Sequence, residues 1–179
     1  MHQDIARILL TEEQICGRVK EIAEAVNREY ADKNPLVVGI LKGGIVFYAD
    51  LIRRLSIPAE LDFMAVSSYG TGAVSSGKLK VKKDLDSAVC GRDVLIVEDI
   101  IDSGFTLANL KELLKERGAS SVRIVTLLDK AGRRAYEIEP DYNCFCIANE
   151  FVVGYGLDYN ERYRHLPYIG ILKREVYEK

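Results

Sequence analysis

The sequence has little histidine, cysteine or proline and no tryptophan: 179 residues include two histidines, four cysteines and four prolines. His2 and His165 lie in neither a Gly-x-Ser-x-Gly nor a His-Glu-x-x-His pattern, so the motifs of those serine hydrolases and zinc proteases are missing. The cysteines are scattered, and only Cys144 and Cys146, in an apolar segment, lie close together. We therefore expect reduced thiols rather than a disulfide framework or a zinc site.

Long apolar runs and a strong net charge are also missing. No stretch approaches the roughly 18 to 20 apolar residues of a membrane helix, and the first residues, Met-His-Gln-Asp, do not resemble a secretory signal. The 25 basic and 27 acidic residues give a formal charge of −2, so no global field would recruit nucleic acid or an anionic membrane. These features predict a cytoplasmic protein with no membrane partner, for which nucleic acid is not an expected ligand.

What is present favours one α/β domain. With 48% hydrophobic residues, the chain can bury one sizeable core but is too short for two ordinary domains. Apolar runs of strand length alternate with helical patterns, which is typical of a parallel sheet with right-handed crossovers. The expected strands cover residues 36–41, 61–66, 93–97, 122–128 and 142–148, and the expected helices cover 11–32, 45–55 and a segment ending at Gly118.

Two segments do not follow this alternation. Residues 70–86 are rich in glycine and serine and end in charged residues, which predicts a mobile loop or hairpin. The aromatic-rich tail from Phe151 to Tyr177 is expected to form a separate lid.

The most informative stretch lies between the strand at 93–97 and the following helix, where residues 98–106 read EDIIDSGFT. Ligands of doubly wound sheets bind at the carboxyl ends of strands, where this stretch must lie. Residues 103–106 bring backbone N–H groups and two hydroxyls to a helix N-terminus, an arrangement suited to phosphate. A lone acid before Ser-Gly is often only a helix cap, but three crowded carboxylates favour a cation or a polyhydroxyl ligand.

Residues 94–106, VLIVEDIIDSGFT, resemble the motif with which type I phosphoribosyltransferases bind 5-phosphoribosyl-1-pyrophosphate (PRPP), most closely that of the hypoxanthine-guanine enzymes. Other segments resemble the same family in the same order. They are residues 41–44 for its pyrophosphate loop, 67–70 for the start of its closing loop, and 129–130 and 151–161 for its purine-recognition elements.

The resemblance implies the type I phosphoribosyltransferase fold, a twisted parallel sheet flanked by helices with a small hood from the chain termini. It implies a single domain over residues 1–179, with a core at about 11–148, a hood from about 1–10 and 149–179, and a mobile loop at about 68–86. It also implies a homodimer or homotetramer. The family often has a cis peptide bond at Leu41-Lys42, and the sequence does not decide whether this chain has one.

The implied reaction is Mg²⁺-dependent transfer of 5-phosphoribosyl from PRPP to hypoxanthine or guanine, giving IMP or GMP and pyrophosphate. Asp102 would be the general base that takes a proton from the N7 side of the purine. Glu98 and Asp99 would bind the ribose hydroxyls and hold Mg²⁺, and Asp158 would help hold a second Mg²⁺. The remaining contacts to PRPP would come from Lys42, Gly43 and Arg164 on pyrophosphate, Ser103, Gly104, Phe105 and Thr106 on the 5-phosphate, and Ser68 and Tyr69 at the start of the closing loop.

The purine would be recognised by Lys130, Phe151 and Val152. The Lys130 ammonium would donate to the 6-oxo group, Phe151 would stack on the base, and Val152 would contact it through main-chain atoms. Considered singly, these residues have ordinary alternatives, since most lysines are solvated and a phenylalanine starting a strand is more often core. Similarly, Lys-Gly-Gly after a strand can be a simple tight turn.

Two rival functions share the fold. A nucleotide-sensing RNA-binding regulator would use the PRPP site for control, and a basic row of Lys78, Lys80, Lys82 and Lys83 keeps this reading open. The joint presence of Asp102, Lys130 and Asp158 and the acidic composition oppose it. An enzyme for adenine or a pyrimidine is the nearer rival, but a lysine directed at an oxo group favours hypoxanthine and guanine. The sequence does not decide whether xanthine is accepted.

Overall fold

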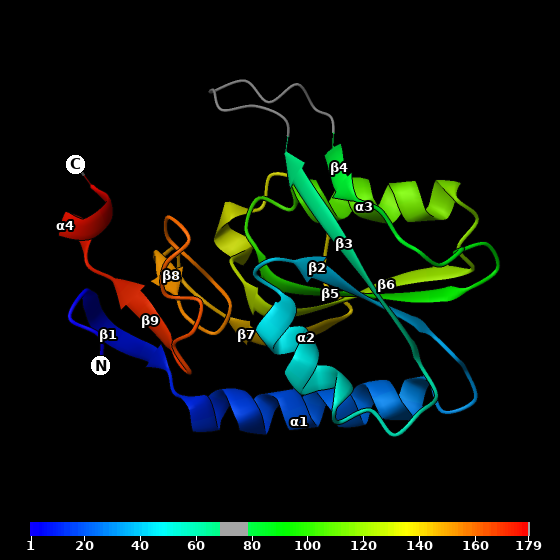
Figure 1. The fold of residues 1–179 in the computed structure, drawn as a ribbon, viewed down its shortest axis with the longest axis horizontal. Coiled ribbons are helices and arrows are strands. Elements are labelled where there is room, and N and C mark those ends of the chain that lie inside the picture. Colours follow the sequence, from blue (N-terminus) through cyan, green and yellow to red (C-terminus); the bar gives the residue numbers. More distant parts are fainter. Residues whose placement is uncertain (69–78, 179) are drawn as a thin grey trace.

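The computed structural model describes residues 1–68 and 79–178 (Figure 1). Its helices are α1 (Glu12–Glu29), α2 (Ile45–Ile52), α3 (Phe105–Glu116) and α4 (Arg174–Tyr177), with one 3-10 turn, η1 (Ala131–Arg133). Its strands are β1 (Ile5–Leu10), β2 (Leu36–Leu41), β3 (Glu60–Ser68), β4 (Leu79–Lys83), β5 (Asp93–Ile101), β6 (Ser121–Asp129), β7 (Tyr142–Cys146), β8 (Val152–Val153) and β9 (Ile169–Leu172). No described helix is long and apolar enough to cross a membrane.

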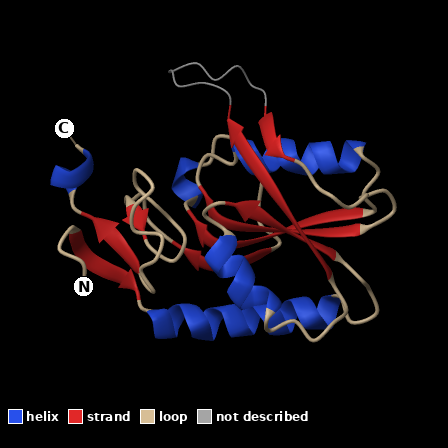
Figure 2. Cartoon of the chain, in the orientation of Figure 1, coloured by secondary structure: helices blue, strands red, loops and turns tan. Residues whose placement is uncertain are grey.

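The central layer is a six-stranded sheet in the order β4-β3-β2-β5-β6-β7. Its pairings are parallel except for β4, which runs antiparallel to β3 at one edge. The predicted parallel sheet is therefore confirmed for five strands, and the edge strand makes the sheet mixed. Figures 1 and 2 show α1 and α2 on one face of the sheet and α3 on the other.

Strand β5 lies between two hydrophobic clusters. Leu95 and Val97 belong to the cluster beneath α1 and α2, while Val94 and Ile96 belong to the cluster beneath α3. All four side chains are fully buried. A strand covered on both faces needs apolar residues at successive positions, which explains the continuous apolar run in the sequence.

The N-terminus of α1 is fixed by the capping box that the sequence predicts. The Thr11 hydroxyl accepts a hydrogen bond from the Gln14 backbone N–H, and the Gln14 side chain accepts one from the Thr11 N–H. The helix ends at Glu29, three residues before the predicted end, where the Tyr30 N–H still bonds to the carbonyl of Val26. Helix α1 thus begins where predicted and ends earlier.

Both ends of the chain form a second, three-stranded antiparallel sheet in the order β1-β9-β8. Figure 1 shows this sheet at one end of the molecule, close to both termini. Strand β1 was not predicted as a strand. Of the predicted loop, residues 79–83 form β4 and residues 69–78 lie outside the described chain. The division into core, hood and mobile loop stays a prediction; "hood" here means β1, β8, β9 and residues 149–179.

Candidate active site

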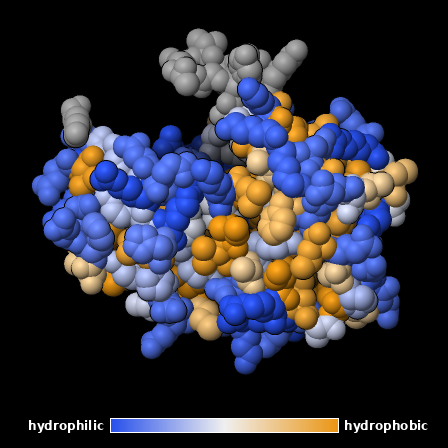
Figure 3. All heavy atoms as spheres, in the orientation of Figure 1, coloured by the Kyte–Doolittle hydropathy of each residue, from blue (hydrophilic) through white to orange (hydrophobic). Residues whose placement is uncertain are grey.

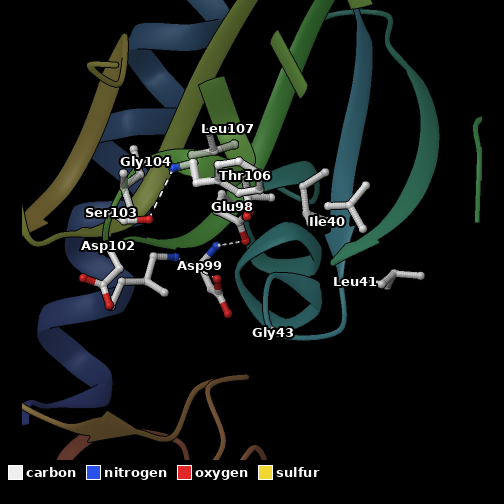
Figure 4. Close-up of a pocket in the computed structure, with 14 residues that line it drawn as sticks. Ile40, Leu41, Gly43, Glu98, Asp99, Asp102, Ser103, Gly104, Thr106 and Leu107 are labelled. Atoms are coloured by element: carbon white, nitrogen blue, oxygen red, sulfur yellow. Dashed lines mark hydrogen bonds between the residues drawn. The ribbon is translucent and has the colours of Figure 1, made fainter. Parts of the chain in front are cut away.

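Strand β5 is four residues longer than the sequence predicts. Ile100 and Ile101 continue the pairing with β6, so Glu98 and Asp99 lie on the strand and not in a loop. Asp102, Ser103 and Gly104 then turn the chain into α3. The turn, the end of β5 and the loop after β2 line a cavity of ≈ 270 Å³ at the carboxyl edge of the sheet (Figure 4).

Glu98 and Asp99 form a pair of neighbouring carboxylates with little access to water. Glu98 is buried, and its Oε1 accepts a hydrogen bond from the Asp99 N–H at 3.1 Å. Burial, followed by the nearby charge of Asp99, raises the pKa of Glu98 well above its usual range. Burial also raises the pKa of Asp99. The pair therefore disfavours two negative charges unless a cation or hydrogen-bond donors compensate them.

The loop between β2 and α2 lies directly against Asp99. A Cβ atom at Gly43 would lie 1.7 Å from Oδ2 of Asp99, so only glycine fits at position 43 with this carboxylate in place. The peptide bond between Leu41 and Lys42 is cis. The main chain of this loop is thus held beside the paired carboxylates.

The turn at residues 102–104 presents the N-terminus of α3 to the cavity. Gly104 has φ +84°, a left-handed conformation that glycine adopts without strain. The Phe105 N–H is 3.4 Å from the Ser103 hydroxyl (Figure 4). The N-terminal N–H groups of a twelve-residue helix have no partner within the helix, so this turn can bind an anion.

Asp102 and Lys130 lie beside each other at this edge. The Lys130 N–H donates to the carbonyl of Ile101 at 2.9 Å, and its side chain is buried. Burial lowers the pKa of Lys130, while the charge of Asp102 acts in the opposite direction. Nε of Arg133 lies 3.0 Å from Oδ1 of Asp102, close enough for an ion pair but not aligned for a hydrogen bond.

A second charged group connects the β2–α2 loop to the hood. Nζ of Lys42 lies 3.1 Å from both carboxylate oxygens of Glu161. Arg164 contacts Oδ1 of Asp158 at 2.8 Å and Oε2 of Glu161 at 3.3 Å. Lys42, as the largest cause, and Arg164 lower the pKa of Glu161. Glu161 thus lies between two cations that the resemblance assigns to pyrophosphate.

Phe151 and Val152 start the hood's short strand β8. The Phe151 ring stacks on Tyr177 with centroids 4.7 Å apart and meets Tyr159 edge-on at 5.5 Å. Phe151 remains 36% exposed. Val152 is buried and pairs with Ile171 of β9.

The structure brings half of the predicted site residues into one cavity. Its lining includes Gly43, Glu98, Asp99, Asp102, Ser103, Gly104, Phe105 and Thr106. The lining does not include Lys42, Lys130, Phe151, Val152, Asp158 or Arg164, and Arg164 lines a different cavity of ≈ 420 Å³. Ser68 ends β3, and Tyr69 lies outside the described residues.

Sequence reasoning missed three charged residues near the site: Arg133, Arg134 and Glu161. Glu161 lies inside the motif at 151–161, which was a usable signal. The two arginines follow Lys130 without any motif. The basic row of the rival RNA-binding hypothesis is only partly described, since Lys78 lies outside the described chain, and Lys83 contacts Asp86 and Asp62.

Comparison with known proteins agrees with this geometry. Residues 7–160 match the phosphoribosyl transferase domain family. The chain is 58% identical over 175 residues to the hypoxanthine-guanine phosphoribosyltransferase of Lactococcus lactis, covering 98% of this chain and 95% of that protein. The crystal structure of a hypoxanthine phosphoribosyltransferase from Staphylococcus aureus matches with a TM-score of 0.97 at 50% identity, covering 100% of this chain and 97% of that one.

A bifunctional protein, TilS/HprT of Listeria monocytogenes, is 56% identical over 179 residues; the match covers this whole chain but only 28% of that protein. The family match over most of the chain and the nearly full-length relatives agree with each other and with the cavity at the carboxyl end of β5. The chain belongs to the hypoxanthine-guanine phosphoribosyltransferase family.

Proposed function

We propose that this protein transfers the 5-phosphoribosyl group of PRPP to hypoxanthine or guanine, producing IMP or GMP and pyrophosphate in purine salvage. One observation carries the proposal: two buried carboxylates, a third carboxylate and an anion-binding helix N-terminus share a single cavity. This combination suits a ligand with two ribose hydroxyls and a 5-phosphate. Family membership supports the same substrates, since the relatives are named for hypoxanthine and guanine.

In the proposed complex, the N–H groups of residues 103–106 bind the 5-phosphate at the N-terminus of α3. Glu98 and Asp99 accept hydrogen bonds from the ribose hydroxyls, which relieves the cost of their burial. Lys42, Gly43 and Arg164 bind the pyrophosphate of PRPP, with the two cations compensating its charge.

The proposed reaction exchanges one bond at C1 of the ribose. A purine nitrogen forms the new glycosidic bond, and the bond from C1 to the pyrophosphate oxygen breaks with its electron pair leaving on pyrophosphate. The proton lost from the N7 side of the purine passes to the carboxylate of Asp102. Positioned charges, rather than a covalent intermediate, supply most of the acceleration.

Base selection follows from the edge of the sheet and the hood. The Lys130 ammonium donates to the 6-oxo group of hypoxanthine or guanine and finds no acceptor on the 6-amino group of adenine. Phe151 offers a ring face to the base, because its exposure leaves part of the ring uncovered. Val152 contributes main-chain contacts.

Mg²⁺ fits the residues present. Glu98 and Asp99 are paired oxygen donors whose raised pKa values reflect missing positive charge, and Asp158 is a third carboxylate beside Arg164. No group of three or more His, Cys, Asp or Glu side chains converges as a metal site within residues 1–68 and 79–178, so substrate oxygens and water would complete the coordination. When bound, Mg²⁺ would neutralise charge on the pyrophosphate.

We further propose a cytoplasmic location and self-association as a homodimer or homotetramer. Figure 3 shows apolar residues gathered over α2 and the adjacent part of β3. Ile45 and Leu61, on these two elements, are 46% and 50% exposed. A second copy covering this face would bury them. Sedimentation of Leu61→Asp, compared with Ile8→Asp in the hood sheet, tests the face: only the former should dissociate, and equal behaviour of both contradicts it.

The decisive experiment measures pyrophosphate release by the purified protein with PRPP and Mg²⁺. Hypoxanthine, guanine, xanthine, adenine and uracil are offered separately, and the same assay is run on Asp102→Asn and on Asp32→Asn, an exposed control. We expect turnover with hypoxanthine or guanine, none with adenine or uracil, and a loss of about 10²- to 10⁴-fold in Asp102→Asn alone. If no base is turned over while PRPP or a nucleotide still binds, the protein is a regulator instead.

A further inference from the structure

Arg134 joins the end of β6 to the turn that follows β5. Its guanidinium is 2.5 Å from Oδ1 of Asp129, the last residue of β6, in an ion pair whose side chains are 11% and 5% exposed. The other terminal nitrogen donates to the carbonyl of Asp102 at 3.0 Å. One buried guanidinium therefore holds two chain segments that are distant in sequence.

The backbone next to Arg134 supports the same turn. The N–H groups of Ala135 and Tyr136 donate to the carbonyl of Ser103 at 2.9 and 3.1 Å. The fit against Gly104 is close, because a Cβ there would lie 3.1 Å from Cδ of Arg134 and 2.5 Å from Ile138. The turn that presents Asp102 and the helix N-terminus thus rests on residues 134–138.

Stability alone is a poor explanation for this arrangement. Desolvation of a buried ion pair offsets much of its attraction, so an apolar pair of equal volume is often as stable. Nε of Arg134 is buried and has no hydrogen-bond partner among the described residues, which adds a further cost. What the guanidinium supplies is geometry: a planar fork with donors in fixed directions, which lysine does not provide.

We propose that Arg134 is a positioning residue that sets Asp102 relative to Lys130. Asp129 directly precedes Lys130, so the guanidinium holds the strand end that carries the base-recognising ammonium and the turn that carries the proton acceptor. This inference rests on the proposed function, in which both groups act on the same purine. Misplacement of one against the other by about 1 Å can cost as much as 100-fold in rate.

Arg133 is the competing candidate, because its Nε lies 3.0 Å from the Asp102 carboxylate itself. Its side chain is 51% exposed, however, and it has no contact with Asp129 among those found in the described chain. Arg133 can hold the carboxylate but cannot fix the distance between the two strand ends. Separate variants distinguish the two arginines.

The test compares Arg134→Lys with the double variant Asp129→Leu/Arg134→Met and with Arg28→Lys, an exposed control on α1. The lysine variant keeps a charge for Asp129 but cannot reach both partners, and the double variant removes both charges at similar volume. We measure kcat for hypoxanthine per PRPP-binding site, so that unfolded protein does not count, together with the binding of PRPP and thermal stability.

We expect kcat to fall about 10- to 100-fold in both variants, while PRPP affinity changes little and the control is unaffected. Added guanidinium should partly restore kcat of Arg134→Ala. The positioning role is wrong if either variant that folds and binds PRPP turns over hypoxanthine like the wild type, or if only Arg133→Gln lowers kcat. Absence of turnover in the wild type would instead contradict the proposed function, so the two failures are distinguishable.

Discussion

Gly43 lets the Asp99 carboxylate lie against the main chain of the pyrophosphate loop. A methyl group at this position would lie 1.7 Å from Oδ2 of Asp99, so Gly43→Ala must displace the loop or the carboxylate. We expect the KM for PRPP to rise about tenfold or more, with little change in secondary structure. Gly17→Ala, at an exposed helical position with nothing near its Cβ, should leave the kinetics unchanged. Equal kinetics in the two variants would contradict this prediction.

The ammonium of Lys130 is the residue whose charge should depend most directly on pH. Burial lowers its pKa below the ordinary value of 10.5, opposed by the charge of Asp102. The protonated form donates to the 6-oxo group, so kcat/KM for hypoxanthine should decrease as pH rises through this lowered pKa. Lys130→Arg keeps its charge over the same range. Its activity should be lower at neutral pH but should not show that alkaline decline, and the same decline in both proteins would exclude Lys130 as its cause.

Site residues could be predicted where the sequence itself groups them. Glu98, Asp99, Asp102 and residues 103–106 are contiguous, and an α/β pattern places such a stretch at the carboxyl end of a strand. Arg134 and Glu161 were not given roles because their partners, Asp102 and Lys42, are far away in the sequence. Only the fold brings these charges together. Whether Phe151, Val152 and Asp158 act as the resemblance implies stays a prediction.

At the scale of elements, the capping box of α1 offers a local test. Thr11→Ala removes the hydroxyl that accepts from the Gln14 N–H, and N-cap losses of this kind lower the free energy of unfolding by about 1 kcal/mol. Thr11→Ser retains the hydroxyl and should remain close to the wild type. Chemical denaturation measures both variants, and kcat should be unaffected. A Thr11→Ala protein as stable as Thr11→Ser would show that the cap contributes nothing.

Elements with a local signal were predicted better than those that depend on distant partners. The starts of α1, α2, β2 and β5 follow from capping, apolar runs and strand length. The end of β5 was missed because Ile100 and Ile101 are held in the strand by pairing with β6. Strand β1 was missed for the same reason, since its partner β9 lies more than 150 residues away. Strand β4 falls in a segment whose composition indicated a loop or hairpin, and its pairing with β3 is that of a hairpin edge.

For the whole molecule, the hood meets the core through charges at the proposed pyrophosphate site. Lys42 comes from the loop after β2, whereas Glu161 and Arg164 come from the hood. In this structure the Glu161 carboxylate lies where both cations can contact it. An incoming pyrophosphate group needs the same cations, so Glu161 should compete with it.

Glu161→Gln removes this competing charge at nearly constant size. We expect inhibition by pyrophosphate to become about 2- to 5-fold stronger, a modest effect because exposed ion pairs are weak. The gain should shrink as salt screens the remaining charges. Glu24→Gln makes the same charge change on the exposed side of α1 and should have no effect. Weaker inhibition in Glu161→Gln would mean that the carboxylate supports pyrophosphate binding, and equal changes in both variants would reduce the effect to net charge.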